Sequence, residues 1–394
     1  MQPKMNIIKK LLRERGIDGA IVSSPENFHY ICGFAAHQHT VSRQANFAGA
    51  VLSDADNEPV FAITMDFEAA VFIEKALGSK IQVRAYDTWV GARDWDEFSS
   101  GLKIADKTNM STYFDVLLES VKELDLEDKT IGIEVDFVPL SFYEKLKDLF
   151  PAAEFVNISQ LFIYARSVKT PEEIEMFRLL CKTADEAFLE VSKIAQIGVC
   201  EREMSQLFRH CVIESGICVP SSWSMFAVGA NSAKLGLPTD ARAKNGNIIK
   251  FDAGVNAEFD FYTTDTSRGW IAGQADPLIH RLKDRLYEAQ RLVIERIKPG
   301  VPINELYRLG FDYVAKEFPS YRRGHLGHSI SMGPQTAEAP FINALEKRPL
   351  EPCMILAIEL PCYIKGLGGF NIEDMVLVTD KGCEVLTPKT PHYL

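Results

Sequence analysis

Four carboxylates lie within or directly after apolar, strand-like runs in the C-terminal part of this 394-residue chain. They form two pairs: Asp252 and Asp265 in FDAGVNAEFDFYTTDTSRGW, then Glu359 and Glu373 in LAIELPCYIKGLGGFNIEDMVLV. His328, in RGHLGHSIS, falls between the pairs. An unpaired carboxylate costs several kcal/mol to bury, so a fold that buries all four must neutralise them with cations. The pattern therefore predicts a metal site at which both pairs meet.

The two pairs have nearly the same internal spacing. Asp252 and Asp265 are 13 residues apart (265 minus 252), and Glu359 and Glu373 are 14 apart (373 minus 359). If each pair lies on two strands of a hairpin or meander, both of its acids can face the same side. Carboxylates and one histidine, without thiolates, suit Mn, Fe(II), Co or Zn. Two such ions sharing a water would lower its pKa and polarise a carbonyl, which predicts hydrolytic chemistry.

The competing interpretation is that these acids are ordinary surface groups at strand ends. We adopt it for Asp374 and Asp380. It is weaker for Asp252 and Glu359, because the apolar runs IIKF and ILAI precede them.

The length of the chain predicts two domains. Residues 1–164 alternate helix and strand, which is typical of an α/β domain. Its expected elements are a helix at 4–15, a buried strand at 17–24 that ends in a Pro-Glu-Asn turn, strands at 47–53 and 59–64, a helix at 66–77 and a closing segment at 154–159. Thr170, Pro171 and Glu173 then form an N-cap, a proline at the first helical position and a capping-box acid. A helix therefore opens the second domain, residues 165–394.

The second domain is expected to contain an internal duplication. In AQIGVCEREM and RIKPGVPINEL, a Gly-Val ends one helix and a glutamate five residues after the glycine begins the next. The glycines, Gly198 and Gly300, are 102 residues apart (300 minus 198), and the acids are displaced by 107 (359 minus 252). Each half reads as two helices followed by strands carrying two carboxylates, so two facing halves would bring all four acids to one centre.

The overall composition, 46% hydrophobic and 25% charged, is typical of a soluble globular protein. The net charge of -11 and the lack of a basic stretch argue against nucleic-acid binding. No apolar run approaches membrane-spanning length and the N-terminus has no signal core, so we expect a cytoplasmic protein with no membrane role. Its eight cysteines are interpreted as reduced core thiols.

Taken together, these segments resemble the pita-bread metallopeptidases, a family that includes aminopeptidase P, prolidase, methionine aminopeptidase and creatinase. LLRERGIDGAIVSSPENFHYICGF resembles the creatinase-type N-terminal domain, and RSVKTPEEIEMFR its link to the catalytic domain. KFDAGV, DTSRGWIAG, GHLGHSI, IELPCY and NIEDMVLVTDKG match the ligand segments of the catalytic domain. The resemblance implies an α/β (α+β) fold, with a creatinase-like domain followed by a pita-bread domain of pseudo-two-fold symmetry.

The resemblance also implies roles for single residues. The residues at the five ligand positions of the family are Asp252, Asp265, His328, Glu359 and Glu373. Glu359 corresponds to the acid that activates the water between two divalent ions (Mn, Co, Fe or Zn). The family usually cleaves the amide next to proline in short peptides and forms homodimers.

The chain departs from the family pattern at three places. The segment between the two aspartates is two residues longer than usual, an even insertion that preserves strand facing. Gln335 occupies the position of a histidine seven residues after the ligand His328. A second histidine is missing upstream, where VGANSAKLGLPTD offers Lys234 or Gly236. In the peptidases those two histidines bind substrate, so the departures leave the metal site in place and bear on proline specificity.

Further residues near the motifs are candidates for the site. His325 is either the neighbouring catalytic imidazole of the family or a structural hydrogen-bond partner. Tyr262 is a candidate for substrate binding, and Arg268 for supporting a ligand carboxylate from behind. His37 and His39, in FAAHQHTVSRQ, are candidates for reaching the pocket of a neighbouring subunit.

We therefore predict a metal-dependent hydrolase of the Xaa-Pro dipeptidase or aminopeptidase type. In it Glu359 is the general base, and His325 or Gln335 donates to the oxyanion. The alternative is a C–N hydrolase or lyase of the same fold that acts on a small non-peptide molecule, like creatinase or ectoine hydrolase. A non-catalytic binding protein is the third possibility, although relatives of that kind have generally lost ligands that this chain retains.

Overall fold

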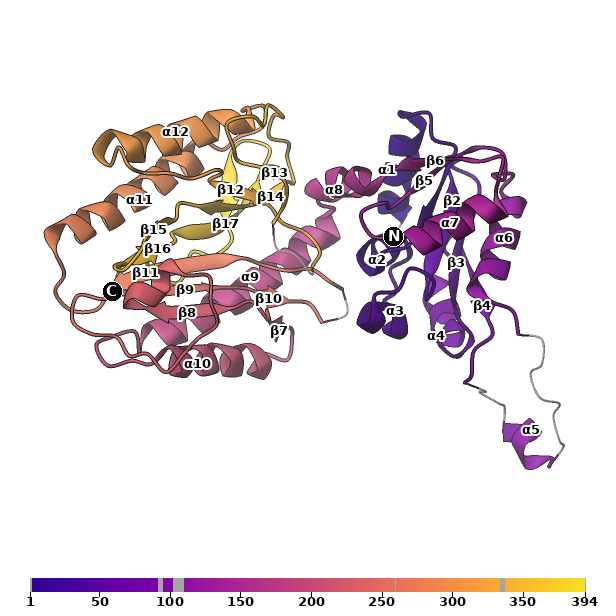
Figure 1. Cartoon of the computed structure of the whole chain (residues 1–394), viewed down its shortest axis with the longest axis horizontal. Helices are drawn as coiled ribbons and strands as arrows, with labels where there is room; N and C mark the ends of the chain where they lie inside the picture. Colours follow the sequence, from indigo (N-terminus) through magenta and orange to yellow (C-terminus); the bar gives the residue numbers. More distant parts are fainter. Residues whose placement is uncertain (1, 91–94, 102–109, 259, 334–336, 394) are drawn as a thin grey trace. The chain divides into compact units, whose positions relative to one another are not determined.

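The computed structural model describes residues 2–90, 95–101, 110–258, 260–333 and 337–393 (Figure 1). The chain divides into two compact units, Met1–Ala165 and Arg166–Leu394. All five predicted metal ligands belong to the second unit.

The first unit is built on a six-stranded mixed sheet with the order β4-β3-β2-β1-β5-β6. Its strands are β1 (Gly19–Val22), β2 (Gly49–Ser53), β3 (Val60–Met65), β4 (Ile81–Tyr86), β5 (Thr130–Ile133) and β6 (Glu154–Asn157). Its helices are α1 (Gln2–Arg13), α2 (Pro25–Cys32), α3 (His37–Ser42), α4 (Asp66–Ala76), α5 (Trp95–Ser99), α6 (Tyr113–Glu123) and α7 (Leu140–Leu149), and α8 (Ser159–Ser167) spans the division. Apolar side chains of the sheet, such as Phe61, pack with Leu117 of α6 and Leu146 of α7 in one buried core.

One local expectation in this unit is wrong. The Pro-Glu-Asn segment that follows the first strand is the first turn of α2 and not an isolated turn. Ser24 caps this helix by accepting a hydrogen bond from the Asn27 backbone, and Pro25 stands at its first position. The buried carboxylate of Glu134, from the segment after β5, accepts further bonds from Ser24 and Asn27, so distant residues secure the helix start.

The second unit contains an eight-stranded sheet with the order β13-β12-β14-β17-β11-β9-β8, with β18 paired to β17. Its strands are β8 (Met225–Val228), β9 (Ile248–Ala253), β11 (Thr266–Ile271), β12 (Gly327–Ser329), β13 (Glu338–Phe341), β14 (Ile355–Glu359), β17 (Glu373–Val378) and β18 (Cys383–Val385). Two short pairs lie outside it: β7 (Val219–Pro220) with β10 (Val255–Asn256), and β15 (Cys362–Ile364) with β16 (Gly368–Phe370). The helices are α9 (Pro171–Ser192), α10 (Glu201–Glu214), η1 (Gly229–Ala233), α11 (Pro277–Arg296) and α12 (Ile303–Glu317).

The predicted start of α9 is confirmed. Thr170 accepts a hydrogen bond from the Glu173 backbone, the Glu173 carboxylate accepts one from the Thr170 backbone, and Pro171 is the first helical residue. The buried face of α9 then meets the sheet: Phe188 stacks on Phe251 of β9, with ring centroids 5.8 Å apart. The same face makes contact with Phe208 of α10, so helices and strands of this half share an aromatic core.

The element order repeats within the second unit, as the duplication requires. Helices α9 and α10 are followed by β8, β9 and β11, and helices α11 and α12 by β12, β14 and β17. In the sheet the two sets run outward from the centre in mirror order, with β11 beside β17. In Figure 1, α9 and α10 lie beside the β8–β9 half, and α11 and α12 beside the β12–β14 half. Gly198 and Gly300, which precede the second helix of each half, both have positive φ, +92° and +84°.

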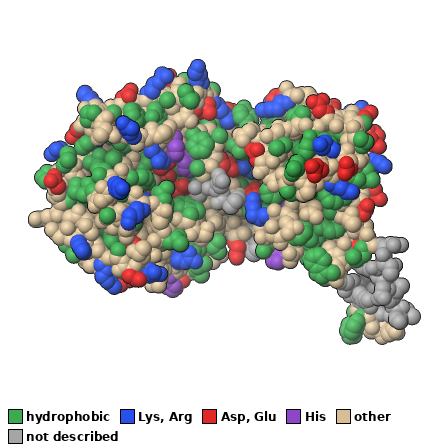
Figure 2. All heavy atoms as spheres, viewed as in Figure 1, with side chains coloured by type: hydrophobic (Ala, Val, Ile, Leu, Met, Phe, Trp, Pro, Cys, Tyr) green, Lys and Arg blue, Asp and Glu red, His purple; other side chains and the backbone are tan. Residues whose placement is uncertain are grey.

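Three further features bear on the composition of the chain: its surface charges, the hydropathy of its helices and the state of its cysteines. On the face shown in Figure 2, basic side chains are interspersed with acidic ones. None of the helices in the described part of the chain is both long and apolar enough to cross a membrane. The eight cysteines are all free thiols.

Candidate metal centre

Four neighbouring strands place the acids at the centre of the sheet. Asp252 on β9 lies opposite Ser267 on β11, and Glu359 on β14 lies opposite Glu373 on β17. The central strands join the halves, because Ser267 also lies opposite Glu373. Asp265 precedes β11 by one residue and has the same parity along the chain as Ser267. The two carboxylate pairs therefore converge where the halves of the sheet meet.

Three of the five predicted ligands form a compact group. One ligand atom from each of Asp265, His328 and Glu373 lies within 4.8 Å of the others, and all three residues are buried. The Nε2 atom of His328 is 3.7 Å from Oδ2 of Asp265. His328 Nδ1 lies 3.0 Å from the Ser329 carbonyl oxygen, a contact that orients the ring with Nε2 toward the carboxylates.

The electrostatics join the other two acids to this group. Burial raises the pKa of Glu373 well above its usual range, and the charges of Asp265, Glu359 and Asp252 raise it further. Burial also raises the pKa of Asp252, to which Glu359 adds, while the Lys250 ammonium opposes the shift. Burial lowers the pKa of His328, so its imidazole is held neutral, the form that ligates a metal. All four carboxylates are thus close enough to repel one another, which is costly without cations.

The residues fit a divalent cation. The donors are carboxylate oxygens and one imidazole nitrogen, a set that borderline and hard divalent ions accept. Beside them, Asn371 donates to Oε2 of Glu373 at 3.2 Å, while its own buried Oδ1 has no hydrogen-bond partner among the described residues. A buried amide oxygen of this kind is satisfied by a water or an ion in the adjacent space.

Two basic side chains that we did not predict contact Asp252 and Glu359, the two acids outside the compact group of three. Lys250 is fully buried (0% side-chain exposure), with Nζ 3.4 Å from Asp252 Oδ2. An Nη atom of Arg323 is 2.9 Å from Oε1 of Glu359, and Nδ1 of His325 is 3.3 Å from the same oxygen. Burial lowers the pKa of His325, the Glu359 charge raises it, and Arg323 lowers it. The sequence could have predicted the place of Lys250, because it stands two residues before Asp252 on the same strand. It could not have predicted that of Arg323, which lies in a loop without periodic spacing.

Sequence models of known families match both units. The model of metallopeptidase family M24 matches residues 175–380, and that of the creatinase/prolidase N-terminal domain matches residues 5–168.

The chain belongs to metallopeptidase family M24.

Several relatives extend the M24 match over the full length. The chain is 25% identical to a Xaa-Pro dipeptidase of Pyrococcus furiosus over 100% of both chains. It is 28% identical to a Xaa-Pro dipeptidase of Lactobacillus helveticus, over 96% of this chain and 95% of the relative. The solved structure of a Xaa-Pro dipeptidase from Bacillus anthracis superposes with a TM-score of 0.81 at 26% identity, covering 100% of this chain and 99% of that one. The predicted α/β fold, with its creatinase-type and pita-bread domains, and the predicted metallopeptidase class are confirmed.

The other residues that we predicted at this M24 site have different surroundings. The hydroxyl of Tyr262 donates to the Glu173 carboxylate at 2.7 Å, a contact that ties the strand segment before Asp265 to the start of α9. Gln335 lies outside the described residues. His37 is exposed, whereas His39 is buried (1% exposed), with Nδ1 2.9 Å from the Gln44 carbonyl oxygen. In this conformation His39 is part of the interior of the first unit.

Arg268 follows Ser267 on β11, so its side chain leaves the face of the sheet opposite to that of the cluster. It donates to the backbone carbonyl of Glu373 at 2.6 Å and to the carboxylate of Asp374 at 2.8 Å. Arg268 thus holds the backbone of a predicted ligand and not its carboxylate. Further donations to the carbonyls of Thr387 and Thr390 bind the C-terminal segment to the same strand.

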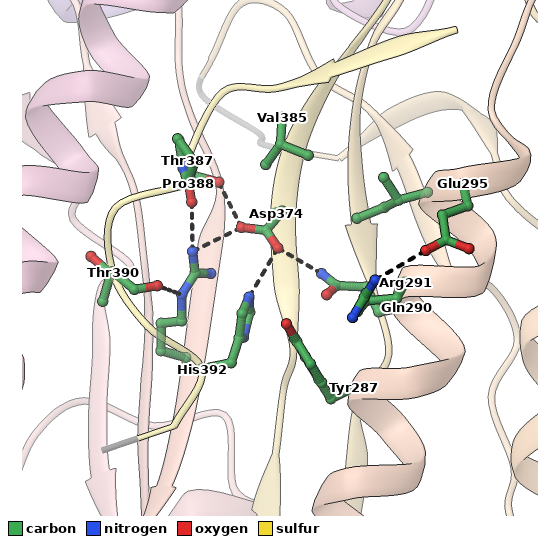
Figure 3. Close-up of a pocket in the computed structure, with 12 residues that line it drawn as sticks. Tyr287, Gln290, Arg291, Glu295, Asp374, Val385, Thr387, Pro388, Thr390 and His392 are labelled. Atoms are coloured by element: carbon green, nitrogen blue, oxygen red, sulfur yellow. Dashed lines mark hydrogen bonds and ion pairs between the residues drawn. The ribbon is translucent and has the colours of Figure 1, made fainter.

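The expectation that Asp374 is a surface acid is wrong, whereas Asp380 is exposed as expected. Asp374 is 5% exposed and lines a cavity of about 260 Å³ with Gln290 of α11 and His392 (Figure 3). It accepts a bond from Gln290 Nε2 at 3.1 Å, and His392 Nε2 lies 3.0 Å away. Burial alone would raise the pKa of Asp374, but Arg268 and His392 lower it to about 2. Asp374 is therefore a buried anion that joins β17, α11 and the C-terminal segment.

Proposed function

We propose that this chain is a metal-dependent peptidase that cleaves short peptides at an Xaa-Pro bond. The observation that carries the proposal is the convergence of Asp265, His328 and Glu373 within 4.8 Å, with Asp252 and Glu359 flanking them, in a chain of metallopeptidase family M24. The proline preference rests on the full-length similarity to proteins named Xaa-Pro dipeptidases.

The cofactor in this proposal is a pair of divalent ions, Mn, Co, Fe or Zn, held by the five predicted ligands. When bound, such ions supply Lewis-acid activation of water and of the scissile carbonyl. Glu359 is the proposed general base, with Oε1 already beside His325 and Arg323. His325 is the proposed donor to the developing oxyanion, because it borders the cluster and is only partly buried.

The division of labour between the domains belongs to the same proposal. Residues 165–394, which contain all five predicted ligands, would carry the catalysis. A homodimer in the cytoplasm is the proposed setting. The free state of all eight cysteines is consistent with a reducing compartment.

A second candidate is hydrolysis of a C–N bond in a small non-peptide molecule. It is favoured by one observation, the replacement of the two substrate-site histidines of the family pattern by Gln335 and by Lys234 or Gly236. The metal ligands and Glu359 would keep their roles, and the pocket around them would differ.

The test is proline release by the metal-loaded protein. Purified protein is stripped with a chelator, reloaded with Mn²⁺ or Co²⁺, and given a panel of Xaa-Pro dipeptides together with matched Xaa-Gly dipeptides. We expect free proline to appear by amino-acid chromatography, and Xaa-Gly to be cleaved more slowly. If protein that retains metal by elemental analysis cleaves none of the panel, the peptidase proposal fails, and cyclic and linear guanidino and amide metabolites become the substrates to screen.

A further inference from the structure

The two halves of the second unit join through few backbone pairs. In the part of the chain that the structure describes, β11 and β17 share a single paired position, Ser267 with Glu373. By contrast, β11 pairs with every residue of β9, and β17 with every residue of β14. Asp252 and Asp265 belong to the half that contains β11, and the other three predicted ligands to the half that contains β17. The distance between the two sets of ligands is therefore set across one sparsely paired join.

Arg268 crosses this join with its side chain. Its Nη1 atom donates to the carbonyl oxygens of Ser267, at 2.9 Å, and Glu373, at 2.6 Å, which are the two paired residues. A guanidinium has further N–H donors in the same plane. Here Nε donates to the Thr390 carbonyl at 2.9 Å, and Nη2 to the Thr387 carbonyl at 2.7 Å. The side chain thus connects both strands of the join to the C-terminal segment.

The C-terminal segment, residues 386–393, is also bound to the first half. The carboxylate of Asp185 on α9 accepts hydrogen bonds from the backbone N–H groups of Lys389, at 2.6 Å, and Thr390, at 2.9 Å. The backbone carbonyl of Asp185 accepts a third bond, from the Thr390 hydroxyl at 2.7 Å. Asp185 is 0% exposed, so these donors replace the water that its charge would otherwise need.

The same segment is bound to the second half by its last aromatic residues. His392 Nε2 lies 3.0 Å from the carboxylate of Asp374 on β17, and its ring centroid is 5.0 Å from that of Tyr287 on α11 (Figure 3). The Tyr393 hydroxyl donates to Asp284 of α11 at 2.9 Å. One short segment therefore contacts a helix of each half and, through Arg268, both strands at the join.

We propose that the C-terminal segment holds the two halves at a fixed separation and thereby sets the geometry of the metal centre. The inference rests on the proposed metal-dependent function. The segment contains none of the predicted ligands, and it acts through the backbone of Ser267 and Glu373. A binding site for a metal works only if its ligands are held within about 0.5 Å of the productive geometry. Asp185 and Thr390 are positioning residues in this inference.

The test is the substitution Asp185→Asn in the full-length protein. An amide offers one acceptor oxygen and turns an NH₂ group toward a backbone N–H, so the hold on the segment weakens. Metal-stripped protein is titrated with Mn²⁺ by calorimetry, and kcat for an Xaa-Pro dipeptide is measured at saturating Mn²⁺. We expect the dissociation constant for Mn²⁺ to rise, and kcat to fall, at least about tenfold each in protein that is folded by circular dichroism.

Glu186→Gln is the matched control. Glu186 is the next residue of α9 and pairs with the side chain of Lys389, but this pair lies at the surface, with side chains 49% and 46% exposed. The substitution should leave Mn²⁺ binding and kcat unchanged, because an exposed pair contributes little.

A milder pair of variants decides the question if Asp185→Asn does not fold. Thr390→Val keeps the shape of the side chain and loses its bond to the Asp185 carbonyl, and we expect Mn²⁺ binding at least about threefold weaker. Thr390→Ser keeps the hydroxyl and should bind Mn²⁺ as the wild type does. Restoration by serine separates the positioning role from a general loss of stability.

The outcomes separate this inference from the proposed function. A folded Asp185→Asn or Thr390→Val protein that binds Mn²⁺ as tightly as Glu186→Gln overturns the role of the C-terminal segment and leaves the metallopeptidase proposal standing. Equal weakening by Glu186→Gln overturns it as well. A wild type that binds no Mn²⁺ overturns both.

Discussion

At the scale of single residues, a substitution of Glu359 tests the proposed general-base role most directly. Glu359→Gln keeps the shape of the side chain and an oxygen for Arg323, but it cannot accept a proton. We expect kcat for Xaa-Pro cleavage to fall roughly 100-fold or more, with the fold retained by circular dichroism. Glu351→Gln, at a half-exposed acid paired with Arg348, is the control and should keep full activity. A Glu359→Gln enzyme within tenfold of the wild type would refute the general-base role.

A second residue-scale prediction concerns the buried anion behind the site. Asp374→Asn leaves the Arg268 guanidinium buried without its charge partner, which costs about 3–5 kcal/mol in the free energy of unfolding. Asp380→Asn, at an exposed acid, should change it by less than about 0.5 kcal/mol. Urea unfolding followed by circular dichroism measures both. Equal effects of the two substitutions would show that the Arg268–Asp374 pair contributes nothing.

The same pair predicts a pH dependence with a definite sign. The pKa of Asp374 is lowered to about 2 in the fold, below the value of about 3.9 of an unfolded aspartate. Its contribution is therefore complete above about pH 4 and is lost as the pH falls toward 2. The stability difference between wild type and Asp374→Asn should be flat from pH 7 to about 5 and shrink below pH 4. A difference that grows on acidification would contradict the assignment.

The sequence pattern predicted the acids of the site but not the basic side chains that pair with them. Asp252 and Glu359 stood out because each ends an apolar run. Side chains alternate between the two faces of a strand, so Lys250 lies on the same face as Asp252, two residues later. Our prediction considered only the acids on that face. Arg323 sits in a loop, and Asp374 meets Gln290 and His392, residues 84 and 18 positions away along the chain. Partners that far apart are set by the tertiary fold, which no local pattern contains.

At the scale of elements, the close approach of two backbone segments fixes the distance between the first pair of acids. A Cβ on Gly254 would lie 1.8 Å from the carbonyl oxygen of Thr264, the residue before Asp265. Gly254→Ala must therefore push these segments apart. We expect a loss of about 2–3 kcal/mol in the free energy of unfolding and weaker Mn²⁺ binding, measured by urea titration and calorimetry.

Gly236 provides the matched control for that substitution. A Cβ on Gly236 meets nothing within 4 Å, so Gly236→Ala should leave both stability and Mn²⁺ binding unchanged. A Gly254→Ala variant that binds Mn²⁺ as well as Gly236→Ala does would show that the spacing of Asp252 and Asp265 is not set at this glycine.

Helix boundaries could be predicted where caps and apolar stripes agree. The start of α9 was predicted from Thr170 before Pro171, and α11 begins with the same signature, Asp276 before Pro277. The start of α2 has the same signature, Ser24 before Pro25, but its Pro-Glu-Asn sequence also suits a turn. The helix forms because Glu134, more than a hundred residues away, accepts hydrogen bonds from its first turn. The two-residue strands β7 and β10 are too short to carry a period at all.

At the scale of the whole molecule, the order of strands in the second unit could be predicted from the sequence only in part. The repeat of Gly-Val segments and acids predicted two equivalent halves. The mirror order of their strands, with β11 beside β17, depends on how the halves join, and nothing in the spacing specifies that join. The family resemblance implied pseudo-two-fold symmetry but no strand order, and the pairing of Ser267 with Glu373 shows where the two halves join.

The arrangement in two units predicts that metal acts on the stability of one of them. In the metal-free state the buried carboxylates of the second unit repel one another, whereas the first unit contains none of the predicted ligands. Mn²⁺ at about 100 times its dissociation constant adds about 2.7 kcal/mol to the stability of the unit that binds it. For a unit of this size we expect the melting temperature to rise on the order of 5–10 °C. Hydrogen–deuterium exchange with and without chelator should locate the added protection in residues 166–394, and Asp265→Asn should abolish most of it. Equal protection of both units would mean that metal binding stabilises the chain as a single cooperative body, and the cluster would then not be the local source of strain that its buried charges imply.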